Sequence, residues 1–220
     1  MLKANSDAIA EASRAVKAGK LVIYPTDTVY GLGCSPFAQR AVERIFEVKE
    51  RARKPLPILA ASFRAAERVA RLDGRAKKLG KAFWPGPLTI VVKKKEALPS
   101  YVTCGSDSVG VRVPKHPVAL RLLRLSGGLM VGTSANKSGR KPPRTAEEAG
   151  EQLGSEVDLV LDSGPTSISR ESTVVDLTQR KAKILREGPI GIRDVERILD
   201  VETSPLDQRE GGRTSRSQAQ

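Results

Sequence analysis

The chain has 220 residues, of which 39% are hydrophobic and 29% charged, a composition typical of a folded globular domain that excludes a disordered or fibrous protein. No run approaches the roughly 20 apolar residues that span a bilayer, and residues 1–20 are polar, so we expect neither a membrane span nor a secretory signal, and a cytoplasmic location. Two cysteines and one histidine are too few for a disulfide framework or a Cys/His zinc site.

The formal charge of +13 points to an anionic partner such as a nucleotide, pyrophosphate or RNA. Residues 201–220 hold three arginines and three acidic residues, so the excess belongs to the part before them. A surface that lysine merely makes soluble would have a similar charge. Aromatic residues make up 4% and do not alternate with the basic ones, which argues against a single-strand binder that stacks bases.

Apolar residues at helical spacing, capping residues before them and glycine or proline after them predict a series of helices. The first predicted helix follows Asn5 and Ser6 and ends at Gly19. Others run from Ala41 to Lys49, Ser62 to Val69, Asp73 to Phe83 and Pro117 to Leu125. A further helix starts at the capping-box pair Thr145 and Glu148, and the last runs from Ile190 to Leu199.

Short apolar or alternating runs predict the strands between these helices. The predicted strands are Leu21–Tyr24, Leu56–Ala60, Leu88–Val92, Val109–Val113, Leu129–Gly132, Val157–Leu161, and Ser172–Leu177 with Ala182–Arg186 as a hairpin. This alternation predicts a single α/β domain over residues 1–200, with a twisted mixed sheet flanked by helices. Residues 201–220 are predicted to be a polar, disordered tail.

The stretch Leu21–Gly33 is the first candidate for a site. A strand breaks at Pro25 into a loop with two threonines, one aspartate and two glycines, and ligands of α/β proteins bind at such strand ends. We interpret it as one wall of an active site. The alternative is a tight connection whose hydroxyls satisfy only local backbone groups.

Further polar residues fall at strand ends or in the loops beyond them. They are Thr26, Asp27, Thr28, Lys49, Arg51, Lys54, Arg112, Ser134, Asn136, Ser172 and Arg186. Several guanidinium and ammonium groups together with hydroxyls are what a polyphosphate needs. The sequence has no P-loop and no strand-linked dinucleotide motif. Nucleophilic catalysis by His116, Cys34 or Cys104 is poorly supported, which leaves positioning and charge neutralisation.

Six ordered motifs carry a family resemblance. They are Tyr24–Gly33, Lys49–Arg51 with Lys54–Leu56, Trp84–Thr89, Val111–Pro114, Thr133–Gly139 and Glu171–Asp176. Together they resemble the YrdC/Sua5 family, the threonylcarbamoyl-AMP synthases, from about the first helix to the last. Because no second domain follows Leu199, the chain is similar to the short, single-domain form.

The resemblance implies a nucleotidyltransferase that converts L-threonine, bicarbonate or CO₂, and ATP into threonylcarbamoyl-AMP and pyrophosphate, for the t6A modification of tRNAs that read ANN codons. It implies a large basic concave cavity, Mg²⁺ with the ATP, and acceptor proteins of a t6A transfer complex. It assigns catalysis to Lys49 and Arg51, and threonine binding to Thr28, Arg112 and Ser172. The residues that it assigns to ATP are Lys49, Arg51, Lys54, Ser108, Ser134, Asn136, Thr145 and Arg186. It assigns no metal-ligating residue.

Departures from the family pattern leave some assignments open. The chain is one residue shorter than many relatives between Arg51 and Pro55, so either Arg53 or Lys54 could take the nucleotide position, and an insertion at Lys141 loosens the assignment of Thr145. Asp27 is either a general base or an acceptor that orders its loop.

Two other functions compete with the synthase. One is a non-catalytic module of the same fold that binds double-stranded RNA or tRNA, which the charge supports. The other is a carbamoyl-transfer domain of the hydrogenase-maturation type, which normally belongs to a much longer chain.

Overall fold

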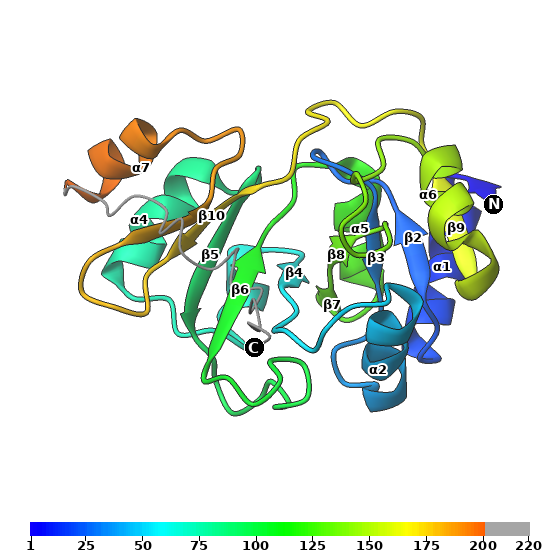
Figure 1. The fold of residues 1–220 in the computed structure, drawn as a ribbon, viewed down its shortest axis with the longest axis horizontal. Coiled ribbons are helices and arrows are strands. Elements are labelled where there is room, and N and C mark those ends of the chain that lie inside the picture. The colour runs from blue at the N-terminus through cyan, green and yellow to red at the C-terminus, as the bar shows by residue number, and fades with distance from the viewer. Residues whose placement is uncertain (201–220) are drawn as a thin grey trace, which may run out of the picture.

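The computed structural model describes residues 1–200, and the prediction for 201–220 lies outside that range. Within the described residues, no helix is long and apolar enough to cross a membrane. The α/β fold that the sequence predicts is confirmed, and helices alternate with short strands along the chain (Figure 1).

The helices begin where the sequence places capping residues. Asn5, Ser62, Asp73 and Thr145 each accept a hydrogen bond from the backbone N–H three residues on, which satisfies a donor that the helix itself leaves free. The helices are α1 (Ser6–Lys17), α2 (Gln39–Val48), α3 (Phe63–Ala66), α4 (Gly74–Phe83), α5 (Pro117–Leu125), α6 (Ala146–Leu153) with a 3-10 turn at Gly154–Glu156, and α7 (Ile192–Leu199).

The strands form two hydrogen-bonded sheets where one was expected. The five-stranded sheet has the order β1 (Leu2–Lys3), β9 (Leu159–Asp162), β2 (Val22–Tyr24), β3 (Gly31–Gly33) and β8 (Thr133–Ser134). The six-stranded sheet has the order β11 (Lys183–Arg186), β10 (Thr173–Asp176), β5 (Leu88–Lys93), β6 (Ser108–Arg112), β4 (Ile58–Ala60) and β7 (Leu129–Val131). Both sheets contain parallel and antiparallel pairs.

Strands β1, β3 and β8 were not expected from the sequence, because they are two or three residues long and β3 contains two glycines. Gly33 is the closest-packed of these residues: a Cβ there would lie 2.3 Å from the carbonyl oxygen of Val131 and 2.9 Å from the Tyr24 ring. The segment predicted as one loop after Pro25 therefore returns as a strand that pairs antiparallel with β2.

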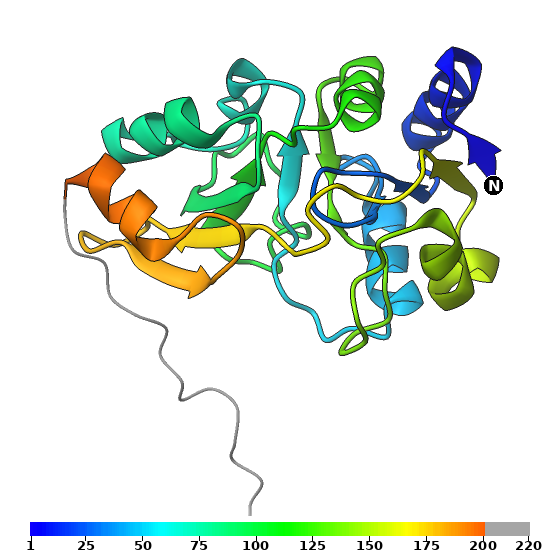
Figure 2. The same ribbon diagram turned by 90° about the horizontal axis from the view of Figure 1, so that it is seen from above.

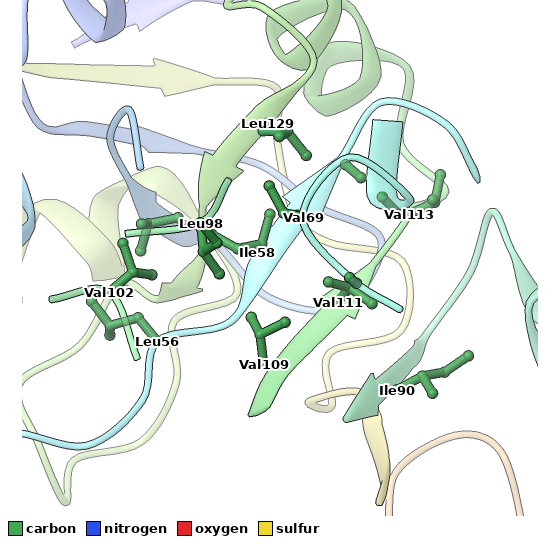
Figure 3. Close-up of a cluster of buried hydrophobic side chains, with 14 of the residues drawn as sticks. Leu56, Ile58, Val69, Ile90, Leu98, Val102, Val109, Val111, Val113 and Leu129 are labelled. Carbon is green, nitrogen blue, oxygen red and sulfur yellow. The ribbon is translucent and has the colours of Figure 1, made fainter. Parts of the chain in front are cut away.

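Two hydrophobic clusters hold the helices against the sheets. The smaller packs α1 and α5, which lie on the same side of the sheets (Figure 2), against Val22 and Leu161. The larger includes Ile58, Val111 and Leu98 around the middle of the six-stranded sheet (Figure 3). These fully buried side chains fix the strands whose ends carry the candidate site.

The chain crosses between the two sheets at places that matter for the site. At Gly132 it passes from β7 to β8, and a Cβ there would lie 2.5 Å from Cγ of Leu59. Residues 163–172 cross from β9 to β10. The segment is tied to the loop after β2, because the Ile168 N–H and the Ser167 hydroxyl both donate to the carbonyl of Asp27.

Candidate active site

A cavity of about 600 Å³ is lined by residues from both sheets. This volume is in the range of small-molecule sites. Its lining includes four cationic side chains and two carboxylates, which are Lys49, Arg51, Arg112, Arg186, Glu171 and Asp176. Hydroxyl and amide side chains add Thr26, Thr28, Thr89, Ser108, Thr133, Ser134, Asn136, Ser138 and Ser172.

Arg112, the last residue of β6, is held on three sides. Its Nη2 lies 2.5 Å from Oδ1 of Asp27, its Nη1 2.9 Å from the Thr28 hydroxyl, and its Nε 2.9 Å from the carbonyl oxygen of Gly86. Burial lowers the pKa of Arg112, and the Asp27 carboxylate opposes that change. The guanidinium is therefore fixed before any ligand enters, which suits recognition of a carboxylate.

The loop after β2 places the Thr28 hydroxyl beside this guanidinium. Thr26 stabilises the loop: its hydroxyl donates to the carbonyl of Val29 at 2.6 Å and lies 3.0 Å from the Thr28 hydroxyl. Asp27 does not line the cavity, and its Oδ1 also accepts from the Lys115 N–H at 3.1 Å. Two roles were considered for Asp27, a general base and an acceptor that orders its loop. Its position behind Arg112 favours the acceptor.

Lys49 joins α2 to the segment after β8. Its ammonium donates to the carbonyl oxygens of Ser134 and Asn136 at 2.5 and 2.6 Å. Burial, and next the nearby charge of Arg51, lower the pKa of Lys49 to about 8. Lys49 thus shapes the cavity wall and supplies a cation whose charge depends on pH near neutrality.

Arg51 and Asn136 stand close to this lysine. The Arg51 guanidinium donates to the Thr133 hydroxyl at 3.3 Å, and burial lowers its pKa. The Asn136 amide nitrogen donates to the carbonyls of Lys137 and Arg140, whereas its buried amide oxygen has no hydrogen-bond partner among the described residues. A ligand that enters here meets a cation and an unused acceptor together.

Ser172 and Arg186 form a further part of the lining. The Ser172 hydroxyl lies 2.8 Å from the Thr89 hydroxyl and accepts from Nη2 of Arg186 at 3.2 Å. Arg186 also donates to the carbonyl of Ser172 at 3.0 Å and to Oε1 of Glu171 at 2.6 Å. These contacts connect the ends of β5, β10 and β11.

The structure brings most of the predicted site residues into this one cavity. The residues that line it are Thr28, Lys49, Arg51, Ser108, Arg112, Ser134, Asn136, Ser172 and Arg186. Lys54 and Thr145 are not in the lining. Lys54 is exposed, and its neighbour Arg53 lies over the Phe46 ring at 5.8 Å. Thr145 caps α6.

Sequence reasoning missed several lining residues, chiefly Thr89, Thr133 and Glu171. The signal was present, because each lies within a motif that carried the family resemblance. It was not used because none of the three is basic or stands in the loop after β2. His116, Cys34 and Cys104 do not line the cavity, and burial raises the pKa of the Cys34 thiol to about 12, which makes it a poor nucleophile.

The cavity brings together side chains from two mixed sheets of one α/β fold. The family model Sua5_yciO_yrdC, described as "Telomere recombination", matches residues 14–188. The chain belongs to this family.

Relatives of known name support the assignment. The threonylcarbamoyl-AMP synthase of Pyrococcus abyssi is 42% identical over 186 residues, which is 84% of this chain and 55% of that protein. The putative threonylcarbamoyl-AMP synthase of Mycobacterium tuberculosis H37Rv is 40% identical and covers 91% of this chain and 93% of its own length. The crystal structure of P. abyssi Sua5 complexed with L-threonine aligns with a TM-score of 0.87 at 38% identity, over 92% of this chain and 61% of that one.

Proposed function

We propose that this protein is a threonylcarbamoyl-AMP synthase, which joins L-threonine, bicarbonate or CO₂, and ATP with release of pyrophosphate. The observation that carries the proposal is that Arg112 and Thr28 lie in the same cavity as Lys49, Arg51 and Arg186. Arg112 and Thr28 can bind an amino-acid carboxylate, and the other three cations can neutralise a triphosphate. The names of the relatives and the bound L-threonine of the P. abyssi structure support the same reading.

Arg112 and Thr28 bind the threonine carboxylate in this proposal, and Ser172 contacts the same substrate. The threonine amine attacks the carbon of CO₂, loses a proton to solvent and becomes a carbamate. A carbamate oxygen then attacks the α-phosphorus of ATP, and the bond from that phosphorus to the bridging oxygen breaks as pyrophosphate leaves. Lys49 and Arg51 neutralise the charge that develops, so catalysis rests on position and charge.

ATP is held by Lys49, Arg51, Ser108, Ser134, Asn136 and Arg186 in this proposal. Among the described residues, no group of three or more His, Cys, Asp or Glu side chains could hold a metal ion. A magnesium ion that arrives with ATP needs only one or two carboxylates besides the phosphates, and Glu171 and Asp176 supply carboxylates in the lining. When bound, Mg²⁺ neutralises charge on the phosphates.

The proposal places the protein in the cytoplasm, with the adenylate passed to proteins of a t6A transfer complex. The formal net charge of +13 would also attract the phosphates of tRNA or double-stranded RNA.

The test is pyrophosphate release by the purified protein with ATP, labelled bicarbonate and a panel of amino acids. Release that requires L-threonine, with label in an adenylate, is the expected result. Equal release with every amino acid, or no release, would contradict the synthase. Absence of release together with RNA binding that falls steeply with salt would instead support the non-catalytic module.

A further inference from the structure

Glu171 is a carboxylate in a cavity that otherwise gathers cations. Four cationic side chains and two carboxylates line that cavity, a difference of two positive charges. Arg112 has its own partner in Asp27, outside the lining. The other cations of the lining are Lys49, Arg51 and Arg186, and Glu171 forms an ion pair with the last of these.

The contacts of Glu171 are those that a phosphate oxygen would make. Its Oε1 accepts from Nη1 of Arg186 at 2.6 Å, while the other nitrogens of that guanidinium bind Ser172. Its charge also acts on Lys49 and Arg51, because it raises the pKa of both against the larger effect of burial. This carboxylate therefore binds Arg186 as a phosphate oxygen would, and its charge favours the protonated forms of Lys49 and Arg51.

A triphosphate that enters the cavity must share or displace this carboxylate. Phosphate oxygens and Glu171 would compete for Arg186, and two anions bound to the same guanidinium repel each other. A divalent cation removes the conflict, since magnesium binds one or two carboxylates together with substrate phosphates. Side chains that are 34% and 40% exposed, as Glu171 and Arg186 are, can change partners without leaving a fully buried charge.

We propose that Glu171 makes this cavity select a nucleoside triphosphate that carries a divalent cation over the metal-free polyanion. The inference rests on the proposed function, since it concerns the residues that would bind ATP. It gives Glu171 a role in choosing the form of the nucleotide, which none of the relatives' names specifies.

The experiment is titration calorimetry of the full chain with ATP, once with Mg²⁺ and once with EDTA, in the absence of threonine. The wild type is expected to bind the magnesium complex more tightly. Glu171→Gln keeps the shape of the side chain and removes its charge, so it should bind metal-free ATP more tightly and reduce the ratio of the two dissociation constants about tenfold. Binding of Mn²⁺ in the presence of ATP, measured by electron paramagnetic resonance, should be weaker in the same variant.

Glu187→Gln is the matched control. Glu187 is one residue beyond Arg186, is exposed and does not line the cavity, so this variant should keep the wild-type ratio. A wild type that binds both forms equally, or a Glu171→Gln variant that binds ATP with an unchanged ratio, would overturn the inference and leave the synthase standing. A folded wild type that binds no ATP in either condition would overturn the proposed function and the inference with it.

Discussion

The two arginine–carboxylate pairs at the cavity differ in how deeply they are buried. Arg112 and Asp27 are buried, with side chains 7% and 4% exposed, and the guanidinium is fixed by three groups, which are the Asp27 carboxylate, the Thr28 hydroxyl and the Gly86 carbonyl. Arg186 and Glu171 are 40% and 34% exposed. The first pair is a rigid receptor for a small carboxylate, whereas the second can exchange partners when a polyanion arrives.

The largest expected effect tests the rigidity of the first pair. Asp27→Ala leaves the buried Arg112 without a counter-charge, so the free energy of unfolding should fall by about 3–5 kcal/mol. Glu171→Ala breaks the half-exposed pair and should cost less than about 1 kcal/mol. Urea unfolding of both variants measures the contrast. Equal losses of unfolding free energy in the two variants would contradict the proposed difference between the buried pair and the half-exposed pair.

The next largest effect is expected on the KM for threonine. Removal of Arg112 deletes charged hydrogen bonds to the substrate carboxylate, so Arg112→Gln should raise the KM for threonine about 10- to 100-fold and leave ATP binding within about twofold. Steady-state pyrophosphate release and calorimetry with ATP measure the two quantities.

A matched double variant separates binding from folding. Asp27→Asn with Arg112→Gln replaces both charges, so it should be more stable than Asp27→Ala while its threonine KM stays high. If both substrates were lost equally in the stable double variant, Arg112 would be structural.

Lys49 should make ATP binding sensitive to pH. Its pKa of about 8 lies below the usual 10.5, so the ammonium loses its charge as the pH rises through about 8, and ATP affinity should fall by about tenfold between pH 7 and 9. Threonine binding at Arg112 should not follow this titration. Calorimetry across the pH range is the measurement, and a flat ATP profile would contradict it.

The lowered pKa of Lys49 should also make the stability of the fold depend on pH, in the direction opposite to its effect on ATP affinity. Because the folded pKa is lowered, the unfolded chain holds the Lys49 proton more tightly between about pH 8 and 10.5. The contribution of Lys49 to stability therefore rises with pH across that window. Lys49→Met should remove that part of the pH dependence in thermal unfolding curves.

At Thr145 we expect a small effect on stability and none on substrate binding. Thr145→Ala removes the hydrogen bond at 3.2 Å to the Glu148 N–H and should cost about 1 kcal/mol of stability. Since Thr145 lies outside the cavity lining, the KM for ATP should stay unchanged, and Thr145→Ser should behave as the wild type. A large rise in the ATP KM of a folded Thr145→Ala variant would place Thr145 back in the nucleotide site.

The sequence predicted much of this arrangement because local rules decide it. Capping residues marked the starts of α1, α3, α4 and α6, and β-branched runs marked β5 and β6. The Asp27–Arg112 pair was not predictable, because it joins a loop of one sheet to a strand end of the other. The division into two sheets likewise depends on tertiary packing at Gly132, where the chain crosses between them.

The placement of Lys54 and Thr145 shows a limit of transfer by motif. Both stand near departures from the family pattern, and both lie outside the cavity lining. A one-residue change in a loop moves every side chain that follows it, and sequence alone does not say where the loop absorbs the change. Glu171 was overlooked for another reason, since an acidic residue is not expected where phosphate binds.

A crystal structure with L-threonine and a non-hydrolysable ATP analogue tests the central claim most directly. The threonine carboxylate is expected within hydrogen-bond distance of Arg112 and Thr28, and the triphosphate beside Lys49, Arg51 and Arg186 in the same cavity. Either ligand bound away from those side chains would contradict it.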